Sequence, residues 1–142
     1  MSVTANQTTA TFTILVVDDE SEVLRVVEAF LSNQGFRVVT AGGAETAIRV
    51  FEQMARKPDL ILTDVVMPGM SGPMMVEHLQ RKYPDLRVLF MSGYDERQVV
   101  QKYVVERGFA LVSKPLAFDK LAATIQEIID PVPRAAELET AR

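Results

Sequence analysis

The sequence contains no cysteine and only one histidine, His78. Without cysteine the chain forms neither a disulfide framework nor a thiolate zinc site, and a lone histidine cannot build a cluster of metal-binding imidazoles. No apolar run approaches the roughly 18 residues that span a bilayer. These absences exclude thiol redox chemistry, the usual zinc centres and insertion into a membrane.

The sequence also lacks an excess of positive charge. It has 15 Lys and Arg against 19 Asp and Glu, which gives a formal net charge of -4. A chain with this charge balance does not carry the basic surface that binds the phosphate backbone of a nucleic acid, so we expect no direct binding to nucleic acid. The first eleven residues, MSVTANQTTAT, have neither the positive nor the apolar region of a secretory signal, so we expect a cytoplasmic protein.

What the sequence does contain is enough apolar material for one folded domain, since 48% of its 142 residues are hydrophobic. Five short apolar runs alternate with longer segments of helical periodicity. The runs cover residues 12–17, 36–40, 60–62, 88–91 and 109–112. This alternation predicts a (βα)5 fold, a three-layer α/β sandwich around a parallel sheet.

The predicted domain covers residues 12–130 and is flanked by two polar tails. Residues 1–11 are rich in threonine, and residues 131–142 contain few large apolar side chains. We therefore expect a flexible tail at 1–11 and a tail or linker at 131–142. Within the domain, the run at 36–40 contains Arg37 and Thr40 and suits an edge strand, whereas the runs at 12–17 and 88–91 suit central strands.

Polar side chains stand where four of the five predicted strands end. They are Asp18, Asp19 and Glu20 at the first strand, Asp64 at the third, Ser92 at the fourth and Lys114 at the fifth. Ligands of open parallel sheets bind outside the carboxyl ends of the strands, so one pocket is expected to hold all of them. Each residue alone also fits a helix cap, a turn or a solvated charge, but their joint placement favours a site.

The chemistry of these side chains points to a divalent cation and to phosphate. Clustered carboxylates repel one another unless a cation lies among them. Ligands that are all oxygen favour Mg²⁺ or Mn²⁺, and Mg²⁺ commonly binds one or two carboxylates together with phosphate oxygens. A carboxylate can attack phosphorus to form an aspartyl-phosphate when the charge of the phosphoryl group is neutralised, and Lys114 and Ser92 are suited to help.

These motifs resemble the receiver domain of two-component response regulators over residues 12–130. The matching segments are ILVVDDE at 14–20, DVVMPGMSG at 64–72, MSG at 91–93 and SKPL at 113–116. The resemblance implies a flavodoxin-like sheet with the strand order 2-1-3-4-5. The segment MSGY at 91–94 is more similar to receivers attached to hybrid histidine kinases than to those of DNA-binding regulators.

The resemblance also implies roles for individual residues. Asp64 matches the phosphoacceptor, and Asp18 and Asp19 match the acids that hold Mg²⁺ directly or through water. The backbone carbonyl of Val66 is then a further metal ligand, beside Asp64 itself.

Two more positions match the parts of a receiver that respond to phosphorylation. Ser92 matches the hydroxyl that bonds the new phosphoryl group, and Lys114 matches the ammonium that pairs with it. The Lys114–Pro115 bond is a candidate for a cis peptide, with an ordinary trans turn as the alternative. Many receivers carry an aromatic residue three positions before the lysine, where this chain has Leu111. Tyr94 either replaces that aromatic, shields the phosphoryl group, or simply packs on its loop.

The function implied is that of a phosphorylation-switched signalling module. Its partner is a sensor histidine kinase or a histidine phosphotransfer domain, it uses Mg²⁺, and it catalyses only its own phosphorylation and dephosphorylation. By analogy with the family, downstream partners contact the fourth helix, the fifth strand and the fifth helix; a homodimer is left open. The alternatives are a Mg²⁺-dependent phosphatase or phosphotransferase of the haloacid-dehalogenase type, for whose cap 142 residues leave no room, and an interaction module that is never phosphorylated.

Overall fold

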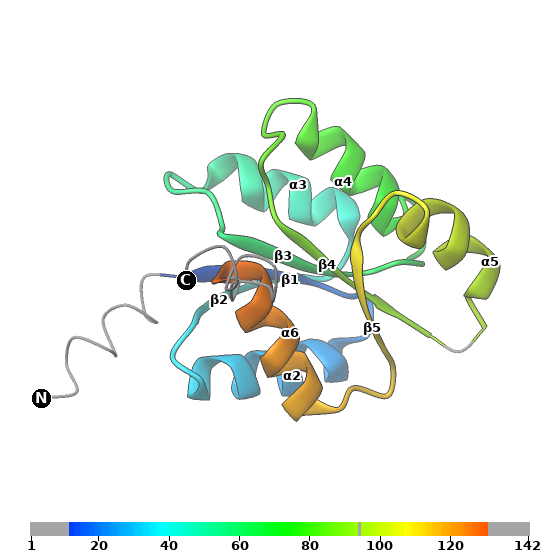
Figure 1. Ribbon diagram of the computed structural model, residues 1–142. Coiled ribbons are helices and arrows are strands. Elements are labelled where there is room, and N and C mark those ends of the chain that lie inside the picture. Colours follow the sequence, from blue (N-terminus) through cyan, green and yellow to red (C-terminus); the bar gives the residue numbers. More distant parts are fainter. Residues whose placement is uncertain (1–11, 94, 131–142) are drawn as a thin grey trace, which may run out of the picture.

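A computed structural model describes residues 12–93 and 95–130 (Figure 1). The two predicted tails, 1–11 and 131–142, and Tyr94 lie outside the described residues. Within the described part of the chain, no helix is both long enough and apolar enough to cross a membrane.

Five strands form one parallel sheet in the order β2-β1-β3-β4-β5. The strands are β1 (Thr13–Val17), β2 (Arg37–Ala41), β3 (Leu60–Asp64), β4 (Val88–Ser92) and β5 (Ala110–Ser113). The helices are α2 (Ser21–Asn33), α3 (Ala44–Gln53), α4 (Gly72–Gln80), α5 (Arg97–Val100), the π-helix η1 (Gln101–Val105) and α6 (Phe118–Ile129). The predicted fold class and strand order are both confirmed.

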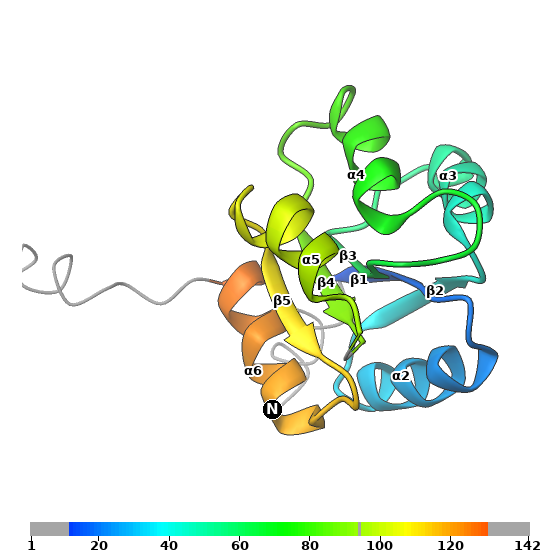
Figure 2. The same cartoon turned by 90° about the vertical axis from the view of Figure 1, so that its right-hand side faces the viewer.

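Helices cover both faces of this sheet. Figures 1 and 2 show α3, α4 and α5 on one face and α2 and α6 on the other. Because side chains alternate along a strand, Leu15 and Val17 of β1 pack in the core under α3 and α4, whereas Ile14 and Val16 pack in the core over α2 and α6. All five residues of β1 are buried, which explains why this strand is continuously apolar in the sequence.

The structure departs from the sequence prediction at the fourth helix. The apolar residues of this segment predict one regular helix, but α5 has only 4 residues and continues as the 5-residue π-helix η1. Val100 of α5 and Val104 of η1 are both buried in the core, and the amide of Glu106 donates to the carbonyl of Gln101, five residues back, at 3.0 Å. This element is therefore less regular than the sequence predicts.

Four of the five strands end one or two residues later than predicted, and this matters for the site. Asp64 and Ser92 are the last residues of β3 and β4 rather than the residues after them. Both are therefore fixed by strand pairing, with Asp64 in register with Met91 and Ser92 with Ser113. β2 is an edge strand, as its polar residues predict.

Candidate functional site

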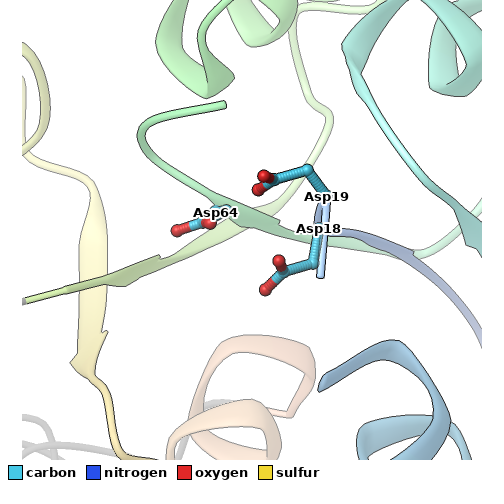
Figure 3. A group of neighbouring side chains, drawn as sticks. All are labelled: Asp18, Asp19 and Asp64. Atoms are coloured by element: carbon cyan, nitrogen blue, oxygen red, sulfur yellow. The ribbon is translucent and has the colours of Figure 1, made fainter. Parts of the chain in front are cut away.

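Three carboxylates meet at the carboxyl edge of the sheet. β1 and β3 are neighbours, with Val17 in register with Thr63, so Asp18 and Asp64 follow side by side. Asp18, Asp19 and Asp64 each place a carboxylate oxygen within 4.8 Å of the others (Figure 3). Asp18 and Asp64 are buried and Asp19 is exposed. The structure thus brings together the three acids that the sequence analysis selected.

Lys114 reaches this cluster from the end of β5. Its Nζ donates to Asp18 Oδ2 at 2.8 Å, to Asp64 Oδ2 at 3.2 Å and to Glu20 Oε1 at 3.2 Å. The side chain of Lys114 is only 16% exposed, whereas that of Glu20 is 62% exposed. The contact with Glu20 gives that acid a partner, although the sequence analysis assigned it no role.

Backbone amides hold the two buried carboxylates in fixed orientations. Asp18 Oδ1 accepts a hydrogen bond from the amide of Glu20 at 2.9 Å, and Asp64 Oδ1 accepts one from the amide of Val65 at 3.1 Å. In both aspartates the other oxygen, Oδ2, contacts the ammonium of Lys114. These bonds preorganise the acids around one cationic group.

The electrostatics of the cluster favour an uncharged Asp64 as long as no metal is bound. Burial and the charge of Asp18 raise the pKa of Asp64 from its ordinary 3.8 to about 7, although Lys114 acts in the opposite direction. For Lys114, burial lowers the pKa, but the hydrogen bond with Asp18 and the charges of Asp64 and Asp18 outweigh it and raise the pKa. The lysine therefore stays charged beside an acid that resists ionisation.

This raised pKa predicts a pH dependence of stability. Between about pH 4 and about pH 7 the folded protein binds more protons at Asp64 than the unfolded chain does, so stability falls as pH rises through this window. In EDTA, we expect the stability advantage of Asp64→Asn over wild type to grow as pH rises from about 4 to about 8. Allowing for solvent screening, the growth in unfolding free energy should be about 1–2 kcal/mol. Urea unfolding measures it. A stability difference between the two proteins that does not change with pH would contradict the raised pKa of Asp64.

The remaining residues selected from the sequence lie around the acids. Ser92 is buried at the end of β4, and its backbone carbonyl accepts the amide of Lys114 at 2.8 Å. Ser92, Leu111 and Lys114 help line a cavity of 290 Å³. The side chain of Val66, directly after β3 and Val65, is exposed. The Lys114–Pro115 bond is cis, as the sequence analysis suggested.

Gly72 is a supporting residue whose part the sequence analysis did not identify. It opens α4, and its amide donates to the carbonyl of Val65 at 2.8 Å. A Cβ atom at this position would overlap the backbone carbonyl oxygen of Asp64 and stand 3.3 Å from the ring of Phe90. The absence of a side chain therefore allows α4 to pack directly on the backbone that carries Asp64.

We expect Gly72→Ala to lower the free energy of unfolding by about 2–4 kcal/mol, because a rigid backbone atom rather than a flexible side chain meets the new methyl group. The matched control is Gly42→Ala, since a Cβ at Gly42 meets nothing within 4 Å. Its stability should stay within about 0.5 kcal/mol of wild type. Urea unfolding of both variants tests this, and equal stabilities would contradict the packing argument.

With this geometry established, comparison with known proteins identifies the family. The response regulator receiver domain matches residues 14–126. The chain belongs to this family. Among curated relatives, the sensor kinase CckA of Brucella abortus (strain 2308) is 30% identical over 118 residues, which cover 83% of this chain and 12% of CckA. The DNA-binding transcriptional regulator NtrC of Escherichia coli (strain K12) is 29% identical over 117 residues, 82% of this chain and 24% of NtrC.

Solved structures agree with this assignment. A response regulator receiver domain protein from Clostridium thermocellum superposes with a TM-score of 0.77 at 26% identity, covering 84% of this chain and 94% of that one. The receiver domain of the hybrid histidine kinase CckA superposes with a TM-score of 0.70 at 29% identity, covering 83% of this chain and 99% of that one. This chain is therefore similar to parts of longer proteins and also to solved structures that contain little more than a receiver domain.

The family fixes the general function. This chain is a receiver domain of two-component phosphorelay signalling, a class of signalling modules rather than conventional enzymes. Receiver domains interact with histidine kinases or phosphotransfer partners and generally bind Mg²⁺ at an acidic pocket, and this chain has a cluster of three aspartates at the carboxyl edge of its sheet. The chain spans only 12% of CckA and 24% of NtrC, so the activities of those whole proteins are not transferred to it.

Proposed function

We propose that Asp64 accepts a phosphoryl group from a phosphohistidine of a partner kinase or phosphotransfer domain. The observation that carries this proposal is the juxtaposition of the buried Asp64 carboxylate with Asp18, Asp19 and the ammonium of Lys114. We assign the Mg²⁺ ligands to Asp18, Asp19, Asp64 and the backbone carbonyl of Val66. Three carboxylate oxygens within 4.8 Å of one another fit the oxygen ligands that this ion prefers.

The transfer itself exchanges one bond for another. A carboxylate oxygen of Asp64 attacks phosphorus, the phosphorus–nitrogen bond of the phosphohistidine breaks, and the imidazole leaves with the electron pair. Mg²⁺, when bound, supplies positive charge that neutralises the phosphoryl oxygens. Lys114 contributes a second positive charge, and the hydroxyl of Ser92 contributes a hydrogen-bond donor. Hydrolysis of the acyl phosphate by water later returns the free carboxylate.

Phosphorylation also supplies the signal. The new group carries about two negative charges and competes for the ammonium of Lys114, which in this structure is bound to Asp18 and Glu20 as well as Asp64. Recruitment of Lys114 and Ser92 towards the phosphoryl group moves the ends of β4 and β5. We propose that this movement changes the surface of α5, β5 and α6 that meets the downstream partner.

The experiment that tests the proposed function is intact mass spectrometry after incubation with acetyl phosphate. We expect a gain of one phosphoryl group in Mg²⁺ and none in EDTA. Failure to gain the group under any condition would overturn the proposal and favour an interaction module that is not phosphorylated. A gain that does not depend on Mg²⁺ would overturn the metal assignment.

An apolar groove beside the acids supports a docking place for the phosphodonor. The groove has a volume of 560 Å³ and shares Lys114 with the site. Its apolar lining comes from Val23, Val26 and Val27 of α2, and from Pro115, Leu116 and Phe118. The phosphohistidine must come within bonding distance of Asp64. The protein that carries this histidine therefore has to cover the surface around Asp64. We propose that the helix bearing that histidine lies in this groove.

We expect Val26→Glu to slow phosphotransfer from a phosphohistidine protein by about thirtyfold, the effect of losing one central apolar contact. Val26 is 52% exposed, so the change does not disturb the core. Phosphorylation by acetyl phosphate should stay unchanged. The matched control is Val105→Glu, on the exposed face of η1, where the wild-type residue is 46% exposed. Equal losses in both variants, or a loss with acetyl phosphate as well, would contradict this docking place.

A further inference from the structure

β5 is the last strand of the sheet and faces the viewer in Figure 2, between α5 and α6. The amide of Lys114 donates to the carbonyl of Ser92 on β4 at 2.8 Å. Because the backbone groups of a strand point alternately to its two sides, Val112 also faces β4, whereas Leu111 and Ser113 direct their N–H and C=O groups to the outer edge. No strand in the described part of the chain pairs with these groups.

A groove with a volume of 480 Å³ runs along this outer edge. Leu111, Val112 and Ser113 all line the groove, although successive side chains of a strand point to opposite faces of the sheet. A groove lined by three consecutive residues therefore lies beside the strand rather than over one face of it. The opposite wall includes Ala123 and Thr124 of α6, whose small side chains leave the space between helix and strand open.

The sequence of β5 does not protect this edge with charge. Soluble proteins commonly place a charged residue in an exposed edge strand, because an open edge pairs readily with other chains. β2, at the opposite edge, begins with the exposed Arg37, whereas the sequence of β5 is ALVS. Its length of 4 residues limits pairing to one short segment. Among the described residues that line the groove, the only charged one is Lys120, which is exposed on α6.

We propose that the outer edge of β5 binds an extended segment of a partner protein, which joins the sheet as a further strand. The backbone groups of Leu111 and Ser113 bind the main chain of this segment. Its side chains that turn towards α6 are apolar and fill the groove, and an acidic residue contacts Lys120. This inference names how a partner contacts the surface of α5, β5 and α6, and its part in signalling rests on the proposed function. The pairing itself requires no phosphoryl group.

An NMR titration of the unphosphorylated, ¹⁵N-labelled protein tests the pairing. The probe is a hexapeptide of alternating valine and aspartate with both ends capped. We expect a Kd of about 1 mM or tighter. At about ten times the Kd, amide hydrogen exchange at Leu111 and Ser113 should slow by about tenfold, whereas that at Val112, which faces β4, should change by less than about twofold. An absence of binding at about 10 mM peptide would overturn the proposal.

Two N-methylated forms of the probe test whether its main chain makes the contact. Methylation removes the N–H group of every valine in one form and of every aspartate in the other. Only one of these two sets of N–H groups faces β5 in an added strand. One form should therefore bind as the unmodified probe does, and the other should bind at least about tenfold more weakly. Equal affinities of the two forms would overturn the strand pairing.

Ser113→Pro makes the matching change in the protein. Proline removes the outward N–H group of Ser113 but leaves the pairing with β4, and edge strands tolerate proline at such a position. We expect the affinity for the probe to fall by about tenfold, while Ser113→Ala, which keeps the N–H group, stays within about twofold of wild type. Wild-type affinity in Ser113→Pro would contradict the pairing.

Lys120→Ala tests the acidic character of the partner. The affinity for the probe should fall by about threefold at low salt, as expected for a solvent-exposed ion pair. The same loss should be absent for a probe in which asparagine replaces aspartate. An unchanged affinity of Lys120→Ala for the acidic probe would overturn the acidic contact.

Two further measurements separate this inference from its alternatives. Sedimentation of the free protein tests self-pairing: a dimer that Ser113→Pro dissociates would assign the edge to a second copy of the chain and overturn the partner segment. Intact mass after incubation with acetyl phosphate tests the proposed function separately. A protein that gains the phosphoryl group but does not bind the probe refutes this inference alone. A protein that binds the probe but never gains the group refutes the proposed function and leaves the strand pairing supported.

Discussion

Asp64→Asn is expected to abolish phosphorylation, with a rate below about one thousandth of the wild-type rate. The amide is nearly the same size as the carboxylate, but it is neutral and lacks the nucleophilic oxygen on which bond formation to phosphorus depends. The fold should survive, because the change removes a buried charge whose pKa is already raised to about 7. Intact mass after incubation with acetyl phosphate and Mg²⁺ gives the result directly.

A suitable control for this variant is Asp119→Asn. Asp119 lies exposed in the first turn of α6, so the control makes the same chemical change outside the acid cluster. It should gain one phosphoryl group as the wild type does. Were Asp64→Asn to gain the group at a comparable rate, another residue would be the acceptor.

Lys114→Ala is expected to lower the free energy of unfolding by about 2–3 kcal/mol at about pH 8 in EDTA. The ammonium contacts three carboxylates, and the side chain of Asp18, its nearest partner at 2.8 Å, is fully buried. Without the lysine, Asp18 remains as an unpaired buried charge, which costs more than the pair contributes. Because Asp64 takes up a proton below about pH 7, the loss should be smaller at about pH 5.

Mg²⁺ should restore most of the stability lost in Lys114→Ala, since a cation among the same carboxylates replaces the missing charge. The variant is therefore expected to keep metal binding while its response to phosphorylation weakens. Lys120→Ala, an exposed lysine on α6, is the control and should change stability by no more than about 0.5 kcal/mol. A loss in Lys114→Ala that Mg²⁺ does not reduce would contradict the shared site.

Much of the fold and most of the cluster follow from the sequence for a simple physical reason. Buried parallel strands are continuously apolar, so β1 and β4 stand out in the chain, and the residue that ends each strand falls at one edge of the sheet. This argument predicts that Asp18 and Lys114, 96 residues apart in the sequence, share one pocket. In the structure, Lys114 Nζ lies 2.8 Å from Asp18 Oδ2. The conformation of Tyr94 and the two tails lies outside the described residues.

The features that sequence reasoning did not identify depend on contacts between elements. The overlap of a Gly72 side chain with the Asp64 backbone is visible only once α4 is packed on β3. The irregular α5 and η1 follow from fitting Val100 and Val104 into the core, which outweighs the preference for a regular helix.

The central claim of this account is that Asp64 carries the phosphoryl group, and reduction of the phosphorylated protein with borohydride tests it most directly. Hydride displaces phosphate from an acyl phosphate to give an aldehyde, and a second hydride with a proton reduces the aldehyde to an alcohol. A phosphorylated aspartate therefore becomes homoserine at its own position in the chain. We predict that tandem mass spectrometry of the digested protein finds homoserine at position 64 and at no other aspartate. Homoserine at position 18 or 19, or its absence from a protein that has gained the phosphoryl mass, would contradict the assignment.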